Sequence, residues 1–259
     1  MMIEAIILGI VQGLTEFLPV SSTAHLILIP EFLGWQGDIS TLTYDIALHG
    51  GTLLALLVYF RKQWLSLLTA ERPLLLNIVI ATIPAGAAGI LFKDAVSTTL
   101  RSSYVIAASL IAVGVVMLLA ERNRPRRGFA SIGTKDALAI GLAQAVALIP
   151  GVSRSGITIS AGLFGGIERE ASARFSFLLS MPVIAGATLL EGVHLLRNQA
   201  DYDLSLFAAG FAASAVTGFI TIKFLLWFFR RFSLRTFVYY RFALAGIIII
   251  SYLLQKSSA

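Results

Sequence analysis

Apolar stretches of about the length that crosses a membrane recur along this chain, separated by short loops that hold most of its basic residues. Because lipid offers the backbone no hydrogen-bond partner, such stretches fold as helices. Only 13% of the 259 residues are charged, against about 25% in a soluble domain. We therefore predict an all-α polytopic membrane protein with spans at 41–60, 73–92, 103–120, 172–193, 204–229 and 236–254.

The composition excludes several kinds of site. The chain has no cysteine, which rules out disulfides and thiolate chemistry, and its three histidines cannot form a histidine-rich metal site. The net charge of +6 does not indicate a nucleic-acid partner, because basic residues in short loops set membrane orientation and contact anionic lipid. The N-terminal MMIEAIILGI lacks a basic region and a clear cleavage site, so we expect it to belong to the fold.

The stretch GIVQGLTEFLPVSSTAHL interrupts apolar sequence with polar side chains and a proline. We predict one helix over 3–18, which Pro19 ends because the residue before a proline avoids helical backbone. Ser21 or Ser22 can cap a second helix over 21–34. Each piece is shorter than the roughly 20 residues that span a membrane. Together they predict a re-entrant helix–loop–helix over 3–34.

Polar side chains converge at this first helix break. Gln12 and Glu16 lie four residues apart and share a helix face, while His25 follows Ser21 and Ser22 by about one helical turn. An ionisable group in lipid costs roughly 2.5–3.5 kcal/mol, so incidental placement is unfavourable. We therefore expect a carboxylate, hydroxyl groups and an imidazole to face one point.

A second helix break lies at PGVSRSGIT, between short apolar pieces at 135–149 and 153–165, which predict another re-entrant segment over 135–165. Ser153 is placed to cap the second piece. Arg154 needs a partner at apolar depth, and either Glu16 or an anionic ligand could supply it. Helix N-termini that point inward from both breaks would add partial positive charge and free N–H groups, which with an arginine suit a phosphate.

The two halves of the chain repeat at an offset of 132 residues. This offset aligns both broken pieces and the three spans after each, so we predict repeats over 1–127 and 133–259 within one membrane domain. Three spans per half is an odd number, which makes the second repeat inverted, as in transporter-type folds. The matched pairs are Ala5 with Ala137, Gly9 with Gly141, Gln12 with Gln144, Val20 with Val152, Ser21 with Ser153, Gly86 with Gly218 and Gly114 with Gly246.

Basic residues in the loops predict the orientation. Loops after the first, third and fifth spans carry most of them: Arg61, Lys62, Arg72, Arg122, Arg124, Arg126, Arg127, Lys135, Arg230, Arg231 and Arg235. The other side has only Lys93, Arg101, Arg197 and Lys256. The first set is therefore expected in the cytoplasm, with both termini outside and the two breaks meeting within the membrane.

At these two breaks the sequence resembles the undecaprenyl-diphosphate phosphatase, or bacitracin-resistance protein, family. The matching stretches are QGLTEFLPVSSTAH at 12–25 and PGVSRSGIT at 150–158. The resemblance implies hydrolysis of undecaprenyl diphosphate to the monophosphate carrier at the outer side of the bacterial plasma (inner) membrane. It further implies carrier recycling for peptidoglycan synthesis and a supporting divalent cation. Many members carry Glu where this chain has Gln12, which leaves Glu16 as the single carboxylate of the first break.

We predict Ser22 as the nucleophile, with His25 activating it, protonating the leaving oxygen or acting as a rival nucleophile. Glu16 would bind Mg²⁺ or Ca²⁺ or orient His25, and Arg154 would clamp the diphosphate. Supporting contacts to substrate are expected from Gln12, Ser21, Thr23, Ser153, Ser155 and Thr158. We expect His49 and His194 to be interfacial or packing residues, and Lys223 and Arg241 to snorkel or pair locally.

Other functions remain open at this point. A transporter of lipid phosphate would use the same broken helices and site without hydrolysis. A structural ion pair between Arg154 and Glu16 is the plainest interpretation of those two residues. The acid-phosphatase-like lipid phosphatases are rejected, because their PSGH and SRxxxxxH signatures are only echoed here. The expected partners are a polyprenyl diphosphate lipid and membrane lipids, and a second copy of the chain is a further candidate.

Overall fold

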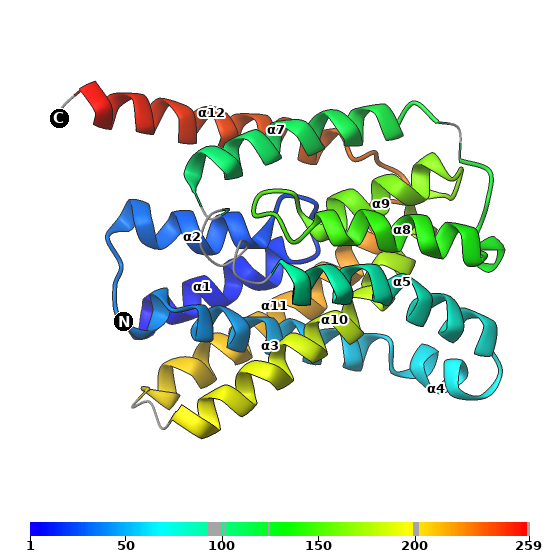
Figure 1. Cartoon of the computed structure of the whole chain (residues 1–259), viewed down its shortest axis with the longest axis horizontal. Coiled ribbons are helices and arrows are strands. Elements are labelled where there is room, and N and C mark those ends of the chain that lie inside the picture. Colours follow the sequence, from blue (N-terminus) through cyan, green and yellow to red (C-terminus); the bar gives the residue numbers. More distant parts are fainter. Residues whose placement is uncertain (93–99, 101, 124, 199–201, 258–259) are drawn as a thin grey trace.

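The computed structural model describes residues 1–92, 100, 102–123, 125–198 and 202–257, and these form helices and no β-sheet (Figure 1). Six helices among them are long and apolar enough to cross a membrane. Each overlaps one predicted span, which confirms an all-helical, multi-pass membrane protein. They are α3 (Leu42–Tyr59), α5 (Arg72–Leu91), α7 (Ser103–Ala120), α10 (Arg169–Asn198), α11 (Leu204–Phe228) and α12 (Arg235–Ser257).

Four shorter helices form two pairs, as predicted: α1 (Met2–Thr15) with α2 (Ser22–Leu33), and α8 (Thr134–Val146) with α9 (Arg154–Phe164). At about 1.5 Å per residue none of them reaches across a hydrocarbon core of roughly 30 Å. The first helix of each pair ends earlier than predicted, at Thr15 and Val146 rather than at 18 and 149. The chain needs those residues to turn before the second helix begins.

Among the described residues, three shorter elements lie outside the helices predicted from the sequence. Helix α4 (Arg61–Thr69) occupies a stretch expected to be a loop, because its polar residues hide the helical pattern. It follows α3 directly and precedes α5. Two 3₁₀ turns, η1 (Asp38–Ser40) and η3 (Phe129–Ser131), lie in other connections.

The second helix of each pair begins at a serine in an unusual backbone conformation. Ser21 caps α2 with φ 77°, and its side chain accepts from the Ala24 N–H at 3.4 Å. Ser153 caps α9 with φ 70° and accepts from the Gly156 N–H at 3.2 Å. Positive φ in a residue other than glycine costs on the order of 1–3 kcal/mol and persists where surrounding contacts enforce it. The two breaks therefore share one strained turn.

Glycines allow three pairs of helices to pack unusually close together. A Cβ on Gly9 of α1 would collide with the Gly210 carbonyl of α11, and one on Gly141 of α8 with the Ala81 carbonyl of α5. Gly114 of α7 faces the Phe242 ring of α12 in the same way. These contacts bring α1 against α11, α8 against α5 and α7 against α12. The breaks that follow α1 and α8 are thereby held inside the helix bundle.

Figure 1 shows the α1–α2 pair and the α8–α9 pair entering from opposite ends of the bundle, with their breaks meeting near its middle. The start of α1 and the end of α12 lie at the same end. Among the loop residues used to predict orientation, Lys93, Arg101 and Arg124 lie outside the described residues. The side chains of Arg197, Lys256 and His194 are likewise outside what the structure describes.

Candidate active site at the meeting of two helix breaks

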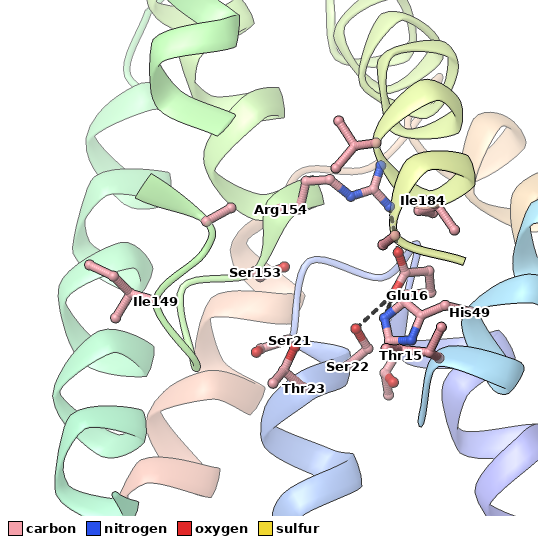
Figure 2. A pocket seen from close by; sticks show the side chains of 14 residues that line it. Thr15, Glu16, Ser21, Ser22, Thr23, His49, Ile149, Ser153, Arg154 and Ile184 are labelled. Carbon is pink, nitrogen blue, oxygen red and sulfur yellow. Dashed lines mark hydrogen bonds and ion pairs between the residues drawn. The ribbon is translucent and has the colours of Figure 1, made fainter. Parts of the chain in front are cut away.

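A cavity of about 220 Å³ lies where the two breaks meet, and side chains from α3 and α10 complete its wall (Figure 2). Its polar lining comprises Thr15, Glu16, Ser21, Ser22, Thr23, His49, Ser153 and Arg154. Its apolar lining includes Ile46, Ile149, Val183, Ile184 and Ala187. Six of the predicted site residues, far apart in sequence, thus share one cavity: Glu16, Ser21, Ser22, Thr23, Ser153 and Arg154.

Glu16 is the centre of the polar contacts, although only 7% of its surface is exposed. Its Oε2 accepts hydrogen bonds from the Ser22 hydroxyl at 2.7 Å and from the Gln12 amide at 3.0 Å. Its Oε1 accepts from Arg154 Nη2 at 2.7 Å. Buried carboxylates need such donors, because removal from water strongly disfavours an unpaired charge. The first break therefore presents one oriented carboxylate with a hydroxyl directly against it.

Arg154 joins the second break to the first. Its Nη2 is committed to Glu16, whereas its buried Nη1 has no hydrogen-bond partner within the described chain. A guanidinium offers five N–H donors in a rigid fork that matches phosphate oxygens. The structure thus contains the Glu16 ion pair that the sequence suggested, and it leaves one buried guanidinium nitrogen of a cavity-lining arginine without a partner.

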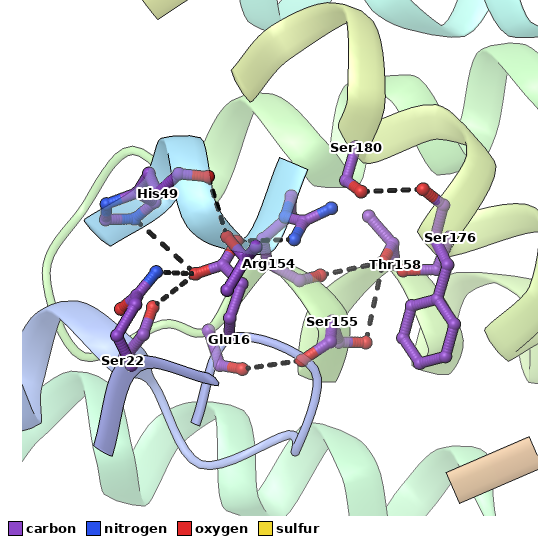
Figure 3. A network of polar contacts seen from close by, with 12 residues as sticks. Glu16, Ser22, His49, Arg154, Ser155, Thr158, Ser176 and Ser180 are labelled. Atoms are coloured by element: carbon purple, nitrogen blue, oxygen red, sulfur yellow. Dashed lines mark hydrogen bonds and ion pairs between the residues drawn. The ribbon is translucent and has the colours of Figure 1, made fainter. Parts of the chain in front are cut away.

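Hydroxyl groups behind Arg154 hold the second break in place (Figure 3). Thr158 donates to the Arg154 carbonyl at 2.7 Å and shares a 2.6 Å contact with the Ser176 hydroxyl of α10. Ser155 donates to the Leu18 carbonyl at 3.2 Å and therefore bridges to the first break. Ser155 and Thr158 were predicted to bind substrate, but both are buried and neither lines the cavity. Their contacts support Arg154 rather than the cavity surface.

Comparison with known proteins identifies the family. Residues 5–247 match the model of the family described as bacitracin resistance protein BacA. The chain belongs to the bacitracin resistance protein family. Proteins named undecaprenyl-diphosphatase are similar over nearly full length. The one from Thermodesulfovibrio yellowstonii is 51% identical, covering 98% of each chain. The one from Elusimicrobium minutum is 46% identical, covering 98% of this chain and 99% of the relative.

His25, predicted to activate Ser22 in this family member, points elsewhere. Its Nδ1 donates to the Ser21 carbonyl at 2.7 Å, because a carbonyl only accepts. Its Nε2 lies 2.7 Å from the Tyr240 hydroxyl, and the two rings stack. His25 does not line the cavity. Ser22 and His25 therefore do not meet at one point as expected, because both ring nitrogens of His25 bond to other groups, Ser21 and Tyr240.

His49, expected to be a packing or interfacial residue, instead lines the cavity of this family member. Its Nε2 lies 3.4 Å from Glu16 Oε2, and its Nδ1 donates to the Asp45 carbonyl at 2.7 Å. Only the fold could bring α3 to the first break. A signal was nevertheless present, since an ionisable residue inside an apolar span is by default a candidate functional group.

The family resemblance implied a supporting divalent cation, which we expected on Glu16, and the contacts of Glu16 argue against a resident one. Both of its carboxylate oxygens already accept from protein donors, and one donor is the Arg154 cation. Calcium and magnesium take six or more oxygen ligands. Among the described residues, no three histidine or acidic side chains gather into a metal-binding group. These side chains therefore do not fit a resident Mg²⁺ or Ca²⁺ site.

Proposed function

We propose that this protein hydrolyses undecaprenyl diphosphate to undecaprenyl phosphate and inorganic phosphate. This reaction recycles the carrier lipid for cell-wall synthesis and confers bacitracin resistance. The observation that carries the proposal is the Ser22 hydroxyl at 2.7 Å from a buried carboxylate, facing a cavity that Arg154 also lines. The names of the relatives agree with it. Transport alone needs no activated hydroxyl, so the same contact favours hydrolysis over a lipid transporter.

In this mechanism Ser22 is the nucleophile and Glu16 its base. The Ser22 proton passes to Glu16 Oε2 as Oγ attacks the terminal phosphorus, and the bond from that phosphorus to the bridging oxygen breaks. Undecaprenyl phosphate leaves with the bonding electron pair, and phosphoserine remains. Water then attacks phosphoserine while Glu16 returns the proton to Oγ. Glu16 therefore takes the role that the sequence analysis gave to His25.

Arg154, which lines the cavity, would bind the diphosphate while its Nη2 keeps Glu16 oriented. The N-termini of α2 and α9 begin at cavity residues Ser21 and Ser153. Each carries roughly half a positive charge, which favours an anion between them. Thr23, on the exposed first turn of α2, is the remaining hydroxyl we assign to substrate contact. The prenyl chain would lie along the apolar helices or in lipid.

We further propose that the two halves form an inverted repeat in one membrane domain, with each short pair entering the membrane without crossing it. The offset of 132 carries α1 onto α8, α2 onto α9 and α3 onto α10, and α5 and α7 onto α11 and α12. The same offset relates the contact between α1 and α11 to the contact between α8 and α5. It also relates Ser21 to Ser153, the two serines with positive φ. The distribution of basic loop residues supports placing both termini outside, and the family resemblance implies the inner membrane and a site that opens to its outer side.

The test is phosphate release from undecaprenyl diphosphate by purified protein, with and without EDTA. We expect Glu16→Gln, Ser22→Ala and Arg154→Ala each to lower the rate at least 100-fold in folded protein. Ser40→Ala and Arg122→Ala remove the same functional groups at exposed sites and should keep wild-type rates. The EDTA arm tests the divalent cation that the resemblance implies. An inactive wild type, with Mg²⁺ and Ca²⁺ both supplied, would overturn the proposed function.

A further inference from the structure

Arg241 lies in the second turn of α12 and is completely buried, with 0% of its surface exposed. Its sequence position predicted that it would snorkel or pair locally, and it does neither. No salt bridge to Arg241 occurs among the described residues. An arginine kept away from both water and carboxylates needs another reason to be there, because burial of an unpaired charge is strongly unfavourable.

The guanidinium of Arg241 is satisfied by backbone carbonyls from three segments. Nε and Nη2 donate to α7, at the Leu110 carbonyl (3.1 Å) and the Ser109 carbonyl (3.2 Å). Nη1 donates to the Pro19 carbonyl of the first break at 3.3 Å. Nη2 also reaches the second break, at the carbonyls of Gly151 (2.8 Å) and Val152 (3.2 Å), so its two N–H groups are shared among three carbonyls. One side chain thus ties both breaks to the α7–α12 pair.

The carbonyls that Arg241 binds occupy matching places in the two breaks. Pro19 precedes Ser21 by two residues, and Gly151 precedes Ser153 by two residues. Ser21 and Ser153 are the two residues other than glycine with positive φ in the described chain. Non-helical carbonyls at this depth require a partner, and strained turns persist only where their surroundings hold them. Arg241 supplies that partner to both turns at once.

We propose that Arg241 is a positioning residue that clamps the two breaks together and thereby sets the geometry of the active site. The residue after Ser21 is Ser22, and the residue after Ser153 is Arg154; both bond to Glu16. Arg241 thus acts within three residues of each partner of Glu16. A misplacement of about 1 Å in such a site can lower a rate on the order of 100-fold. The catalytic part of this inference rests on the proposed phosphatase function.

The clamp depends on the shape of the side chain as well as its charge. Nε, Nη1 and Nη2 point to different segments, as a planar fork of donors allows. A lysine ammonium is a single point on a flexible chain and cannot reach all three segments together. Arg241→Lys keeps the positive charge but loses the planar set of N–H donors, while Arg241→Met loses both the charge and the donors. Lys223→Met, at an exposed position of neighbouring α11, is the matched control.

The experiment combines kinetics with a distance measurement that needs no activity. Because the chain has no cysteine, Phe32→Cys and Phe164→Cys provide the only two attachment sites for spin labels. Both positions are exposed and lie at the ends of α2 and α9 that are farthest from the breaks. We expect a narrow distance distribution in the parent and in Lys223→Met, and a broadened or shifted one in both Arg241 variants. In unlabelled protein we expect kcat to fall about 100-fold with KM changed less than about threefold.

The outcomes separate the clamp from the proposed function. A folded Arg241→Lys with parental distances and wild-type kcat overturns the inference, as does a loss of kcat with unchanged distances. If Arg241→Met does not fold, Arg241→Lys alone decides, because it retains a cation at the same site. If wild-type protein releases no phosphate, the function has failed, and the distances still show whether Arg241 holds the two breaks together.

Discussion

Glu16 and Arg154 form a buried ion pair, and replacing Glu16 should destabilise the protein more than replacing Arg154. The charged groups lie 2.7 Å apart, and the side chains are only 5% and 13% exposed. Glu16→Gln leaves Arg154 with no anion, and removal of one partner of a buried pair typically costs about 3–5 kcal/mol. Arg154→Met leaves Glu16 with its Gln12 and Ser22 donors, so we expect about 1.5–3 kcal/mol, the range for one charged hydrogen bond.

The double variant Glu16→Gln/Arg154→Met removes both charges and should cost less than the sum of the single changes, by about 2 kcal/mol or more. The assay is reversible unfolding in mixed micelles, from which a double-mutant cycle gives the coupling free energy. The exposed pair of Arg230 and Glu170, 63% and 34% exposed, serves as control and should couple by about 0–1 kcal/mol. Costs at Glu16 and Arg154 that add to within about 0.5 kcal/mol would refute a buried, interacting pair.

Three further predictions concern single features. His49→Leu should lower phosphate release about 10–100-fold, while His49→Gln, which keeps a polar side chain beside Glu16, should stay within a few-fold; equal losses would refute a polar role for this side chain. Gly141→Ala should lower the free energy of unfolding by about 1–3 kcal/mol because its Cβ meets the Ala81 carbonyl, whereas Gly89→Ala, with open space around it, should not. Hydrogen bonds from Arg127 and from the Gly133 N–H hold the pKa of Asp136 below its usual value. The stability this contributes is therefore complete above the unfolded pKa of about 3.9 and lost as pH falls through the lower folded pKa. Asp136→Asn should flatten that part of a pH titration of unfolding, and an unchanged titration would contradict the assignment.

The membrane class and the positions of the helices could be predicted because each depends on local properties of the chain. Apolar length defines the spans, and the proline and serine residues of the two breaks mark where the short helices stop and restart. The site could be predicted for a related reason, because polar and charged groups within apolar segments are costly and usually functional; these are Glu16, Ser22 and Arg154. Helix α4 escaped detection because its pattern is neither apolar enough for a span nor polar enough for a loop.

What the sequence could not decide was which side chain meets which. His25 follows Ser22 closely along the chain, yet its ring turns to the Ser21 carbonyl and Tyr240. His49 and Arg241 lie far from the breaks in sequence, yet α3 brings one to Glu16 and α12 brings the other to Pro19 and Gly151. The sequence by itself determined which polar groups lie within apolar segments, because the free energy of burying a side chain is a property of each residue. Only the tertiary structure decided their partners, because a hydrogen bond depends on distance and direction between segments that the chain's order does not constrain.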